Sequence, residues 1–376
     1  MTPRERILKA INRELPDRTP TAWWVRAELV RKLAENFDCD ASDVAAKLGI
    51  EGWGSIGFDV EFPGYKERCN GKLEGDMPYA GSEYIFRSED VFEDAYGVVR
   101  KVGQDRKYVE WVSGPLVNAA SPEEIDFPVV GQILDNPNAA AEVQKQKSEG
   151  LFVTAGIGNP FKTAWEVRGF ENVLTDYLVN REFLETLYDR IYDLYNELTR
   201  RAVHAGVDMI SMTGDISMQD RMIITPKLWR EVDKPRMAYW VSEAKKINPA
   251  VHVFIHSDGN YEEIIPDLVE IGFDVLNPIQ PECMDPAKIK REWGDKVCLH
   301  GTGSIQKTIP FGTVEDVRNE VIHRIENCGY NGGLVLMPSN VIQYDNPIEN
   351  VIAFFETARD YPLEGVAVSK VMMDDG

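Results

Sequence analysis

The chain has 376 residues, of which 43% are hydrophobic and 27% charged, so it can bury a sizeable core and disorder is not expected. It carries 41 Lys and Arg residues against 62 Asp and Glu residues, and the net charge of −21 argues against nucleic acids and anionic membranes as partners. The sequence shows no bilayer-length apolar run, no signal peptide and no CxxC pair among its five cysteines. These features predict a soluble enzyme of the cytoplasm.

The N-terminal segment is predicted to be mainly helical. Thr2, Pro3 and Glu5 have the spacing of a capping box at the start of an amphipathic helix. Two further helices are expected over residues 27–37 and 41–48.

The pattern of apolar and polar residues changes between about residues 57 and 115. Short alternating runs such as SEYIFR and KYVEWV are separated there by Gly and acidic turns, which indicates a small antiparallel β insertion. Because no Pro-, Gly- or Ser-rich linker brackets this insertion, residues 1–376 are expected to form one domain.

From residue 150 onward, apolar runs alternate with helical patterns. The runs predicted to be strands cover residues 151–156, 207–212, 251–256, 273–278, 296–301 and 333–337. Gly206 and Gly272 are expected to end two of the helices, and Pro235 is expected to kink or interrupt another. Short strands separated by crossover helices pair in parallel.

Two more strands would complete a barrel. Residues 19–24 could form one, and a second could lie near residues 55–60 or 112–118. The rival architecture, a doubly wound open sheet, usually carries a GxGxxG turn after a strand, and none occurs here. The sequence therefore predicts an α/β fold, a single (β/α)8 TIM barrel with an N-terminal helical segment and the β insertion near the barrel mouth.

In such barrels the active site lies at the carboxyl ends of the strands. The polar side chains that follow the apolar runs are Asn159, Lys162, Thr213, Asp215, Gln219, Asp220, Arg221, His256, Asp258, Asn277, Gln280, Glu282, Cys283, His300, Thr302, Ser304, Gln306, Ser339, Asn340 and Gln343. These residues are the candidates for catalytic, metal-binding or substrate-binding roles.

The sharpest local feature is His256-Ser257-Asp258. Residues i and i+2 of an extended segment point to the same face, so His256 and Asp258 can converge on one metal ion or ligand. The alternative is that Asp258 caps a turn and His256 satisfies a backbone carbonyl. Asp215, which follows the run 207–212, is a candidate general base, metal ligand or substrate anchor, or else a turn residue.

Two other residues admit a functional and a structural interpretation. Cys283 could bind a soft metal or act as a nucleophile, but a lone cysteine is more often a packed thiol. His300 lies at a predicted strand end, where it could serve the site or be satisfied by a neighbouring layer.

Several segments resemble the uroporphyrinogen decarboxylase superfamily, in the same order and spacing over nearly the whole chain. They are MTPRERILKAINRELPDRTP, HVFIHSDGN, NPIQPE and GGLVLMPSNVIQYDNPIENVIAFFETAR. The resemblance implies a (β/α)8 barrel, in agreement with the strand–helix cadence. It also implies one of two activities, decarboxylation in porphyrin biosynthesis or cobalamin-linked methyl transfer.

The comparison with the superfamily favours the methyltransferase branch. The decarboxylases carry an RQAGRY pattern that binds substrate propionates, whereas this chain has WWVRAELVRKL, with Arg26 and Arg31. The thiol-specific methyltransferases carry a zinc motif His-x-Cys with a distant Cys. Here His256 is retained, but Asp258 and Asn340 stand at the cysteine positions. The soft thiolate site has thus become a site of oxygen ligands or no metal site.

The resemblance implies a methyltransferase that moves a methyl group between a small donor, such as an aryl or alkyl methyl ether, and a cobalamin-binding partner protein. His256, Asp258 and Asp215 would form the acid or metal centre, with His256 and Asp258 as ligands if a divalent metal such as zinc is bound. The expected substrate-binding residues are Asn277, Gln280, Glu282, His300, Gln306 and Asn340. The alternatives are a uroporphyrinogen decarboxylase-type carboxy-lyase and a corrinoid-binding scaffold without turnover, and the chain is compatible with a homodimer.

Overall fold

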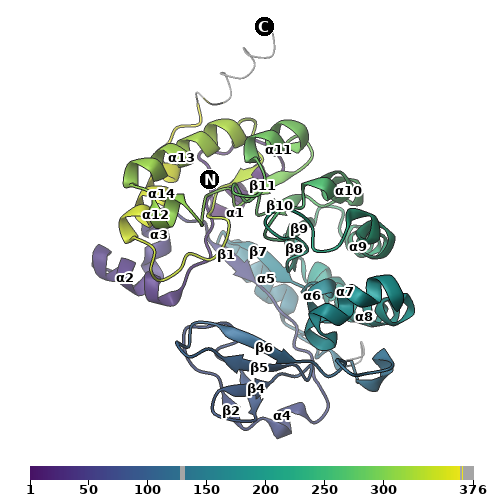
Figure 1. Cartoon of the computed structure of the whole chain (residues 1–376). Coiled ribbons are helices and arrows are strands. Elements are labelled where there is room, and N and C mark those ends of the chain that lie inside the picture. The colour runs from purple at the N-terminus through teal and green to yellow at the C-terminus, as the bar shows by residue number, and fades with distance from the viewer. Residues whose placement is uncertain (128–131, 365, 367–376) are drawn as a thin grey trace.

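Seven short parallel strands form a curved sheet at the centre of the protein, whose computed structural model describes residues 1–127, 132–364 and 366 (Figure 1). In sheet order they are β1 (Trp53–Ser55), β7 (Phe152–Gly156), β8 (Met209–Thr213), β9 (His252–His256), β10 (Val275–Asn277), β11 (Cys298–His300) and β12 (Leu334–Val335). All neighbouring pairs are parallel. The strands β7, β9, β10, β11 and β12 lie within the apolar runs predicted from the sequence, and β8 extends one residue beyond its run, to Thr213.

Residues 19–25 close the ring between β12 and β1. The backbone N–H of Glu51, just before β1, donates to the carbonyl of Thr21 at 3.1 Å. On the other side, the N–H of Ala22 donates to the carbonyl of Leu336, just after β12, at 3.1 Å. The predicted barrel-like α/β fold is therefore confirmed.

The two additional strands differ in detail from the expectation. Residues 19–24 are extended but are attached by isolated bridges instead of a continuous ladder, and Pro20 has no N–H to lengthen that ladder. The other strand is β1, which overlaps the predicted range 55–60 only at Ser55. Residues 112–118 do not contribute a strand to the barrel, because the strand that ends there belongs to the insertion.

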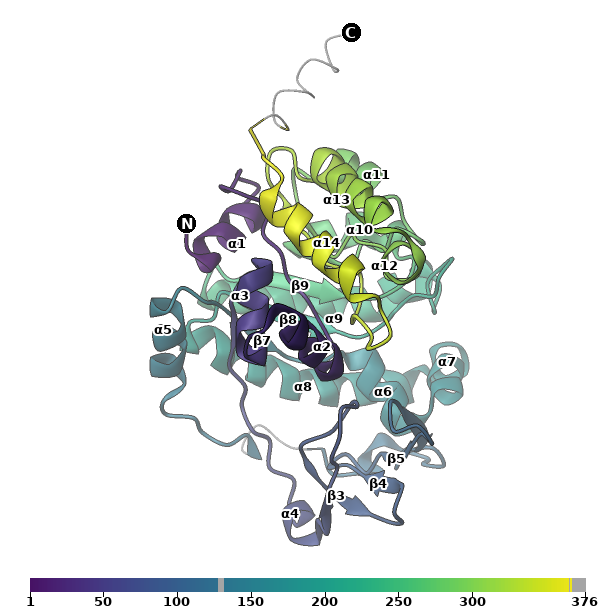
Figure 2. The same cartoon turned by 90° about the vertical axis from the view of Figure 1, so that its left-hand side faces the viewer.

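Helices surround the sheet, and α14 packs between α13 and α3 (Figure 2). The helices are α1 (Pro3–Ile11), α2 (Ala27–Phe37), α3 (Val44–Leu48), α4 (Tyr65–Arg68), α5 (Ala139–Ser148), α6 (Pro160–Arg168), α7 (Phe170–Val179), α8 (Arg181–Ala205), α9 (Pro226–Ile247), α10 (Ile265–Ile271), α11 (Pro286–Trp293), α12 (Thr308–Phe311), α13 (Val314–Cys328) and α14 (Ile348–Asp360). Short 3-10 turns are η1 (Ala41–Asp43), η2 (Pro122–Glu124) and η4 (Glu262–Ile264). Among the described residues, no helix is both long and apolar enough to cross a membrane.

Local signals set the helix ends as predicted. Thr2 and Glu5 form a complete capping box at the start of α1, and Gly206 and Gly272 adopt left-handed conformations that end α8 and α10. The expectation for Pro235 was wrong in part, because α9 runs through it as one assigned helix.

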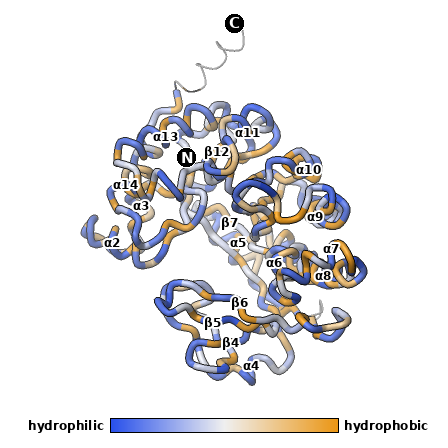
Figure 3. The backbone as a smooth tube through the Cα atoms, viewed as in Figure 1, coloured by the Kyte–Doolittle hydropathy of each residue, from blue (hydrophilic) through white to orange (hydrophobic). Residues whose placement is uncertain are grey.

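The hydrophobic core has two layers, one on each face of the curved sheet. Side chains inside the barrel, such as Met209 and Phe254, pack against Ile7 and Ile11 of α1, which thereby fills one end of the barrel. A larger layer lies between the sheet and the surrounding helices. Hydrophilic stretches run along α2 and α13 (Figure 3), as expected for amphipathic helices with one buried face.

The predicted β insertion is confirmed as a five-stranded antiparallel sheet that forms a lobe beside the barrel (Figure 1). Its strands are β2 (Gly71–Lys72), β3 (Glu83–Phe86), β4 (Val91–Glu93), β5 (Val99–Val102) and β6 (Val109–Ser113). It has a small core of its own around Phe92. Ion pairs join Arg100 to Glu166 of α6 at 3.1 Å and Lys107 to Glu28 of α2 at 2.6 Å. The organisation of residues 1–376 as one domain stays a prediction.

Candidate functional site

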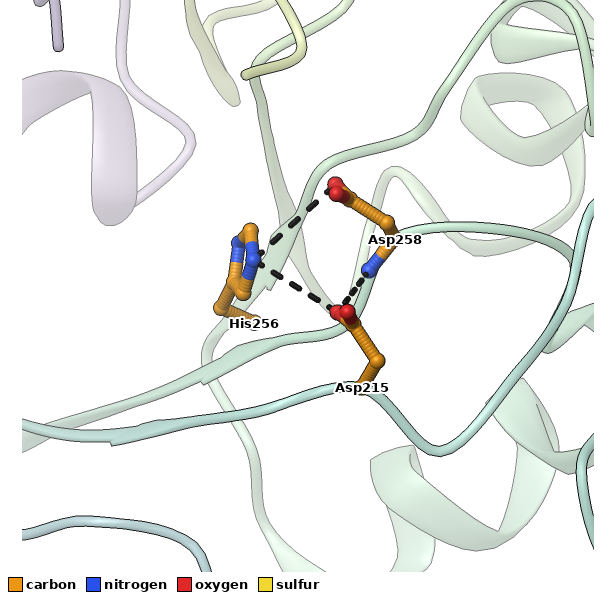
Figure 4. Close-up of side chains that lie close together, drawn as sticks. All are labelled: Asp215, His256 and Asp258. Atoms are coloured by element: carbon orange, nitrogen blue, oxygen red, sulfur yellow. Dashed lines mark hydrogen bonds and ion pairs between the residues drawn. The ribbon is translucent and has the colours of Figure 1, made fainter. Parts of the chain in front are cut away.

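Asp215, His256 and Asp258 converge at the carboxyl ends of β8 and β9 (Figure 4). The Nε2 atom of His256 lies 3.8 Å from Oδ1 of Asp215 and 3.9 Å from Oδ1 of Asp258. In addition, the backbone N–H of Asp258 donates to Oδ1 of Asp215 at 2.9 Å. We refer to these three residues as the acidic centre.

The parallel register places these residues together. The Cα partners of His256 are Thr213, the last residue of β8, and Asn277, the last residue of β10. Asp215 follows Thr213 by two residues, so the end of β8 and the end of β9 deliver their polar side chains to the same place.

Asn277 fixes which nitrogen of His256 carries a proton. The Nδ2 atom of Asn277 donates to the backbone carbonyl of His300 at 3.1 Å, which identifies that atom as the amide nitrogen. The amide oxygen therefore faces Nδ1 of His256 at 2.6 Å and must accept a hydrogen bond from it. With Nδ1 protonated, the neutral His256 ring has its lone pair on Nε2, directed at the two aspartates.

The same amide also sets the state of His300. Nδ2 of Asn277 lies 2.7 Å from Nδ1 of His300, so Nδ1 is the acceptor and Nε2 carries the proton. Burial, together with the nearby His256, lowers the pKa of His300 to about 3, so this ring is neutral at physiological pH.

A hydroxyl network holds the two loops of the acidic centre. The Oγ atom of Ser257 accepts a hydrogen bond from the N–H of Ile216 at 3.0 Å and lies 3.0 Å from Oγ of Ser217. Gly259 has a φ of +88°, and a Cβ atom there would lie 2.3 Å from the carbonyl oxygen of Met218. Only glycine allows the loops to approach this closely.

The carboxyl group of Asp258 has a hydrogen bond on only one of its two oxygens. Its Oδ2 atom accepts a hydrogen bond from Asn340, but its Oδ1 atom is buried without a hydrogen-bond partner among the described residues. Burial raises the pKa of Asp258; the neighbouring Asp215 also raises it, while His256 and Asn340 oppose the shift. A buried carboxylate oxygen without a donor is a position where a cation is favourable.

The acidic centre fits a divalent metal ion. The three ligand atoms lie within 4.8 Å of one another, close to the spacing of roughly 3 to 4 Å for ligand atoms that share one ion at about 2.1 Å. One imidazole and two carboxylates suit an ion such as Zn²⁺ or Mn²⁺, and three protein ligands leave positions open for a substrate. The second nitrogen of His256 is held by Asn277, as is typical of a metal-ligating histidine.

A cavity of about 500 Å³ adjoins the acidic centre. Trp24 lines the cavity and packs edge to face on His256, with ring centroids 5.1 Å apart. Thr213, the neighbour of His256 in the sheet, and His300 also line it. Trp24 and Thr213 thus connect the cavity to the acidic centre, none of whose three residues lines the cavity itself.

The other residues predicted for the site differ in whether they contact the acidic centre. Asn340 reaches the acidic centre through Asp258, and Gln280 accepts a hydrogen bond from the N–H of Gly259 at 3.1 Å, which supports the same loop. Glu282 accepts a hydrogen bond from Ser304. Gln306 is exposed in the turn before α12, and no described contact joins it to the acidic centre. Substrate contacts of all these residues stay predictions.

Cys283 is a thiol at neutral pH. Burial, with the adjacent Glu282, raises its pKa to about 11, and its Sγ atom donates to Oε1 of Gln219 at 3.3 Å. A protonated thiol is neither a nucleophile nor a metal ligand, in agreement with the structural interpretation of this residue.

Two contributors were not identified from the sequence. Trp24 was assigned only to a candidate strand, and Ser257 was treated as the spacer between His256 and Asp258. The aromatic pair at positions 23–24, at the end of an extended segment, was the available signal for the first. Nothing in the sequence indicates that Ser257 would bond to the loop after β8.

The fold and the acidic centre together define a barrel protein with an acidic, histidine-containing site at the carboxyl ends of its strands. Residues 94–361 match the family model described as uroporphyrinogen decarboxylase (URO-D). The chain therefore belongs to the uroporphyrinogen decarboxylase family.

One solved structure confirms this architecture over the full chain. A methyltransferase from Methanosarcina mazei is 18% identical and superimposes with a TM-score of 0.67, over 96% of this chain and 99% of that chain. A B12-independent methionine synthase from Shewanella sp. W3-18-1 is 13% identical with a TM-score of 0.38, over 64% of this chain and 68% of that chain. At 18% identity the likeness to the methyltransferase shows the fold alone, and the TM-score of 0.38 supports no conclusion. No curated protein matches the sequence.

Proposed function

We propose that this protein is a corrinoid-linked methyltransferase, which moves a methyl group from a small neutral donor, an aryl or alkyl methyl ether, to the corrinoid of a cobalamin-binding partner protein. The observation that carries the proposal is the acidic centre of Asp215, His256 and Asp258 beside a cavity whose described lining includes no Arg or Lys. The full-length likeness to the methyltransferase from Methanosarcina mazei supports the fold that the proposal needs.

The lining of the cavity disfavours the alternative, a carboxy-lyase acting on a porphyrinogen. A substrate with many carboxylates needs several cations around it. The described lining contains one ionisable acid, Glu51, and the neutral His300. Arg26, from the segment that corresponds to the propionate-binding pattern of the decarboxylases, contacts Gln343 at 3.4 Å instead.

The residues of the acidic centre would prepare the donor for methyl loss. Asp215, His256 and Asp258 would hold a divalent ion, and that ion would act as a Lewis acid on the donor oxygen so that it can leave. Asn277 accepts a hydrogen bond from Nδ1 of His256, so the neutral ring would present the lone pair of Nε2 to the ion, and the Ser257 network fixes the two loops. Because the partner's reduced corrinoid is a strong nucleophile, the main task of this chain is to improve the leaving group.

Transfer to reduced cobalamin, followed by its absorption spectrum in the presence of a methoxy donor, tests the proposal. His256→Ala and Asp258→Ala should each lower the rate at least 100-fold, whereas His323→Ala, an exposed residue of α13, should not change it. Full rates in both variants of the acidic centre would contradict the assignment. Chromatography of uroporphyrinogen incubated with the protein tests the alternative, and a decarboxylated product would favour it.

A further inference from the structure

The cavity next to the acidic centre is largely aromatic. Its volume of about 500 Å³ lies within the range of small-molecule sites. Trp23, Trp24, Trp53 and Phe254 contribute to its walls, together with Met209. Such a lining favours flat apolar ligands, because aromatic rings pack edge to face or offset against one another.

Among the polar side chains that line this cavity, His300 offers a hydrogen-bond donor that no described protein group accepts. His300 lines the cavity, its Nδ1 atom accepts from Asn277, and its protonated Nε2 atom has no protein partner among the described contacts. The hydroxyls of Thr154 and Ser211, by contrast, donate to strand carbonyls at 3.3 and 3.4 Å. A ligand would therefore need to bring an acceptor.

Aromatic contacts hold His300 in a fixed orientation. Its ring meets Phe254 edge to face at a centroid distance of 5.4 Å, and Trp53 in the same manner at 5.9 Å. The side chain has no room to turn Nε2 away from its present direction without breaking both contacts and the bond from Asn277.

The charges around the cavity select a neutral ligand. The described lining has no Arg or Lys that could pair with an anion. Its acid, Glu51, already forms ion pairs with Arg6 and Arg18, each at 2.8 Å. An ammonium group would have to compete with both guanidinium groups for that carboxylate.

We propose that this cavity binds a neutral aromatic methyl ether, with its ring among Trp24, Trp53 and Phe254 and an oxygen that accepts a hydrogen bond from Nε2 of His300. The inference rests on the proposed methyl transfer and narrows its donor from methyl ethers in general to aryl ethers. His300 acts as a specificity determinant, since it recognises an oxygen that an alkylbenzene lacks.

The test is a ligand-observed NMR titration with four probes of similar size: methoxybenzene, ethylbenzene, methoxycyclohexane and 4-methoxybenzoate. Methoxybenzene should bind roughly tenfold more tightly than each of the others, because they lack the acceptor, the aromatic ring and neutrality respectively. Equal binding of methoxybenzene and ethylbenzene, binding of the benzoate as tight as that of methoxybenzene, or binding of none of the probes would overturn the proposal.

Single-residue variants test which side chains cause the preference for methoxybenzene. His300→Phe keeps a ring but removes the donor, so the preference for methoxybenzene over ethylbenzene should disappear, while His323→Phe on the exposed face of α13 should retain it. Trp53→Leu should weaken methoxybenzene more than methoxycyclohexane. Retention of the preference in folded His300→Phe protein would contradict the role of His300.

The titration separates this inference from the proposed function. If methoxybenzene binds as expected but no methyl reaches cobalamin, the methyl transfer is wrong and the aromatic site stands. If methyl groups are transferred from alkyl ethers and the aromatic probes do not bind, the cavity inference is wrong and the methyl transfer stands.

Discussion

The Nδ1 atom of His256 lies 2.6 Å from the amide oxygen of Asn277, whose amide nitrogen faces His300 on the other side. A single fully buried amide thus sets the proton positions of two histidines, one in the acidic centre and one in the cavity. The chemistry of both parts of the site depends on this side chain.

Asn277→Leu should release both histidines from their fixed tautomers. In wild-type protein labelled with ¹⁵N at histidine, His256 should show a protonated Nδ1 and His300 a protonated Nε2. In the variant these signals should shift towards mixed states, and the free energy of unfolding should fall by roughly 1 to 3 kcal/mol because buried polar groups lose their partners. Asn327→Leu, which removes a similar contact to His323 on the surface of α13, is the control and should change stability by less than about 0.5 kcal/mol. An unchanged His256 spectrum in Asn277→Leu would refute this account.

Asp258→Asn should raise the melting temperature of the metal-free protein at pH 8. Since the pKa of Asp258 is raised in the folded state, its ionisation destabilises the protein, and this destabilisation grows as pH rises above the unfolded pKa. The variant carries no charge to bury, so its advantage should shrink towards pH 4.

The same variant tests the metal site. Zn²⁺ or Mn²⁺ at a hundred times its dissociation constant should stabilise wild-type protein by about 2.7 kcal/mol, and this shift should be largely lost in Asp258→Asn. Asp220→Asn, an exposed position in the loop after β8, should keep the full shift. An equal metal-induced shift in Asp258→Asn would rule out Asp258 as a ligand.

Asp233, which is not part of the acidic centre, should give the protein a second pH dependence. It is buried in α9 and accepts a hydrogen bond from Tyr177 at 2.8 Å, and burial raises its pKa to about 7. Its ionisation therefore costs stability progressively between about pH 4 and pH 7, with a maximum of roughly 4 kcal/mol above pH 7. Asp233→Asn, which keeps the acceptor, should be more stable than wild type in urea at pH 8 and nearly equal to it at pH 4.

Asp267 supplies a control of opposite sign. Burial acts to raise its pKa, but hydrogen bonds from Arg230 and Lys234 outweigh burial and lower it. Its contribution is stabilising above the unfolded pKa and is lost as pH falls, so Asp267→Asn should be less stable than wild type at pH 8. Parallel pH profiles for the two variants would show that the environment of Asp233 is misjudged.

Helix α1 should stabilise the barrel by filling one of its ends. Ile7 is fully buried against the barrel interior, so Ile7→Ala should lower the free energy of unfolding by about 2 to 5 kcal/mol. Lys9 lies on the exposed side of the same helix, and Lys9→Ala should change it by less than about 0.5 kcal/mol. Urea unfolding of both variants provides the comparison, and equal small effects would show that α1 is dispensable.

Much of the fold could be predicted from local sequence. The capping box at Thr2, the stops at Gly206 and Gly272 and the six apolar runs depend on residues near one another in the chain, so their signals are short-range. The eighth segment of the barrel was harder to predict from the sequence. Residues 19–25 are joined by isolated bridges to distant segments, and such pairing leaves no repeating pattern in the sequence.

For the candidate site, the sequence by itself determined that His256 and Asp258 share one face, because alternate residues of an extended strand point the same way. Only the tertiary structure decided that Asp215 joins them, that Asn277 serves two histidines instead of facing open space, and that His300 borders an aromatic cavity. The physical reason is that these relationships depend on the register of neighbouring parallel strands and on burial. Both are set by the packing of segments far apart in the sequence, and burial also governs which carboxyl and imidazole groups carry charge.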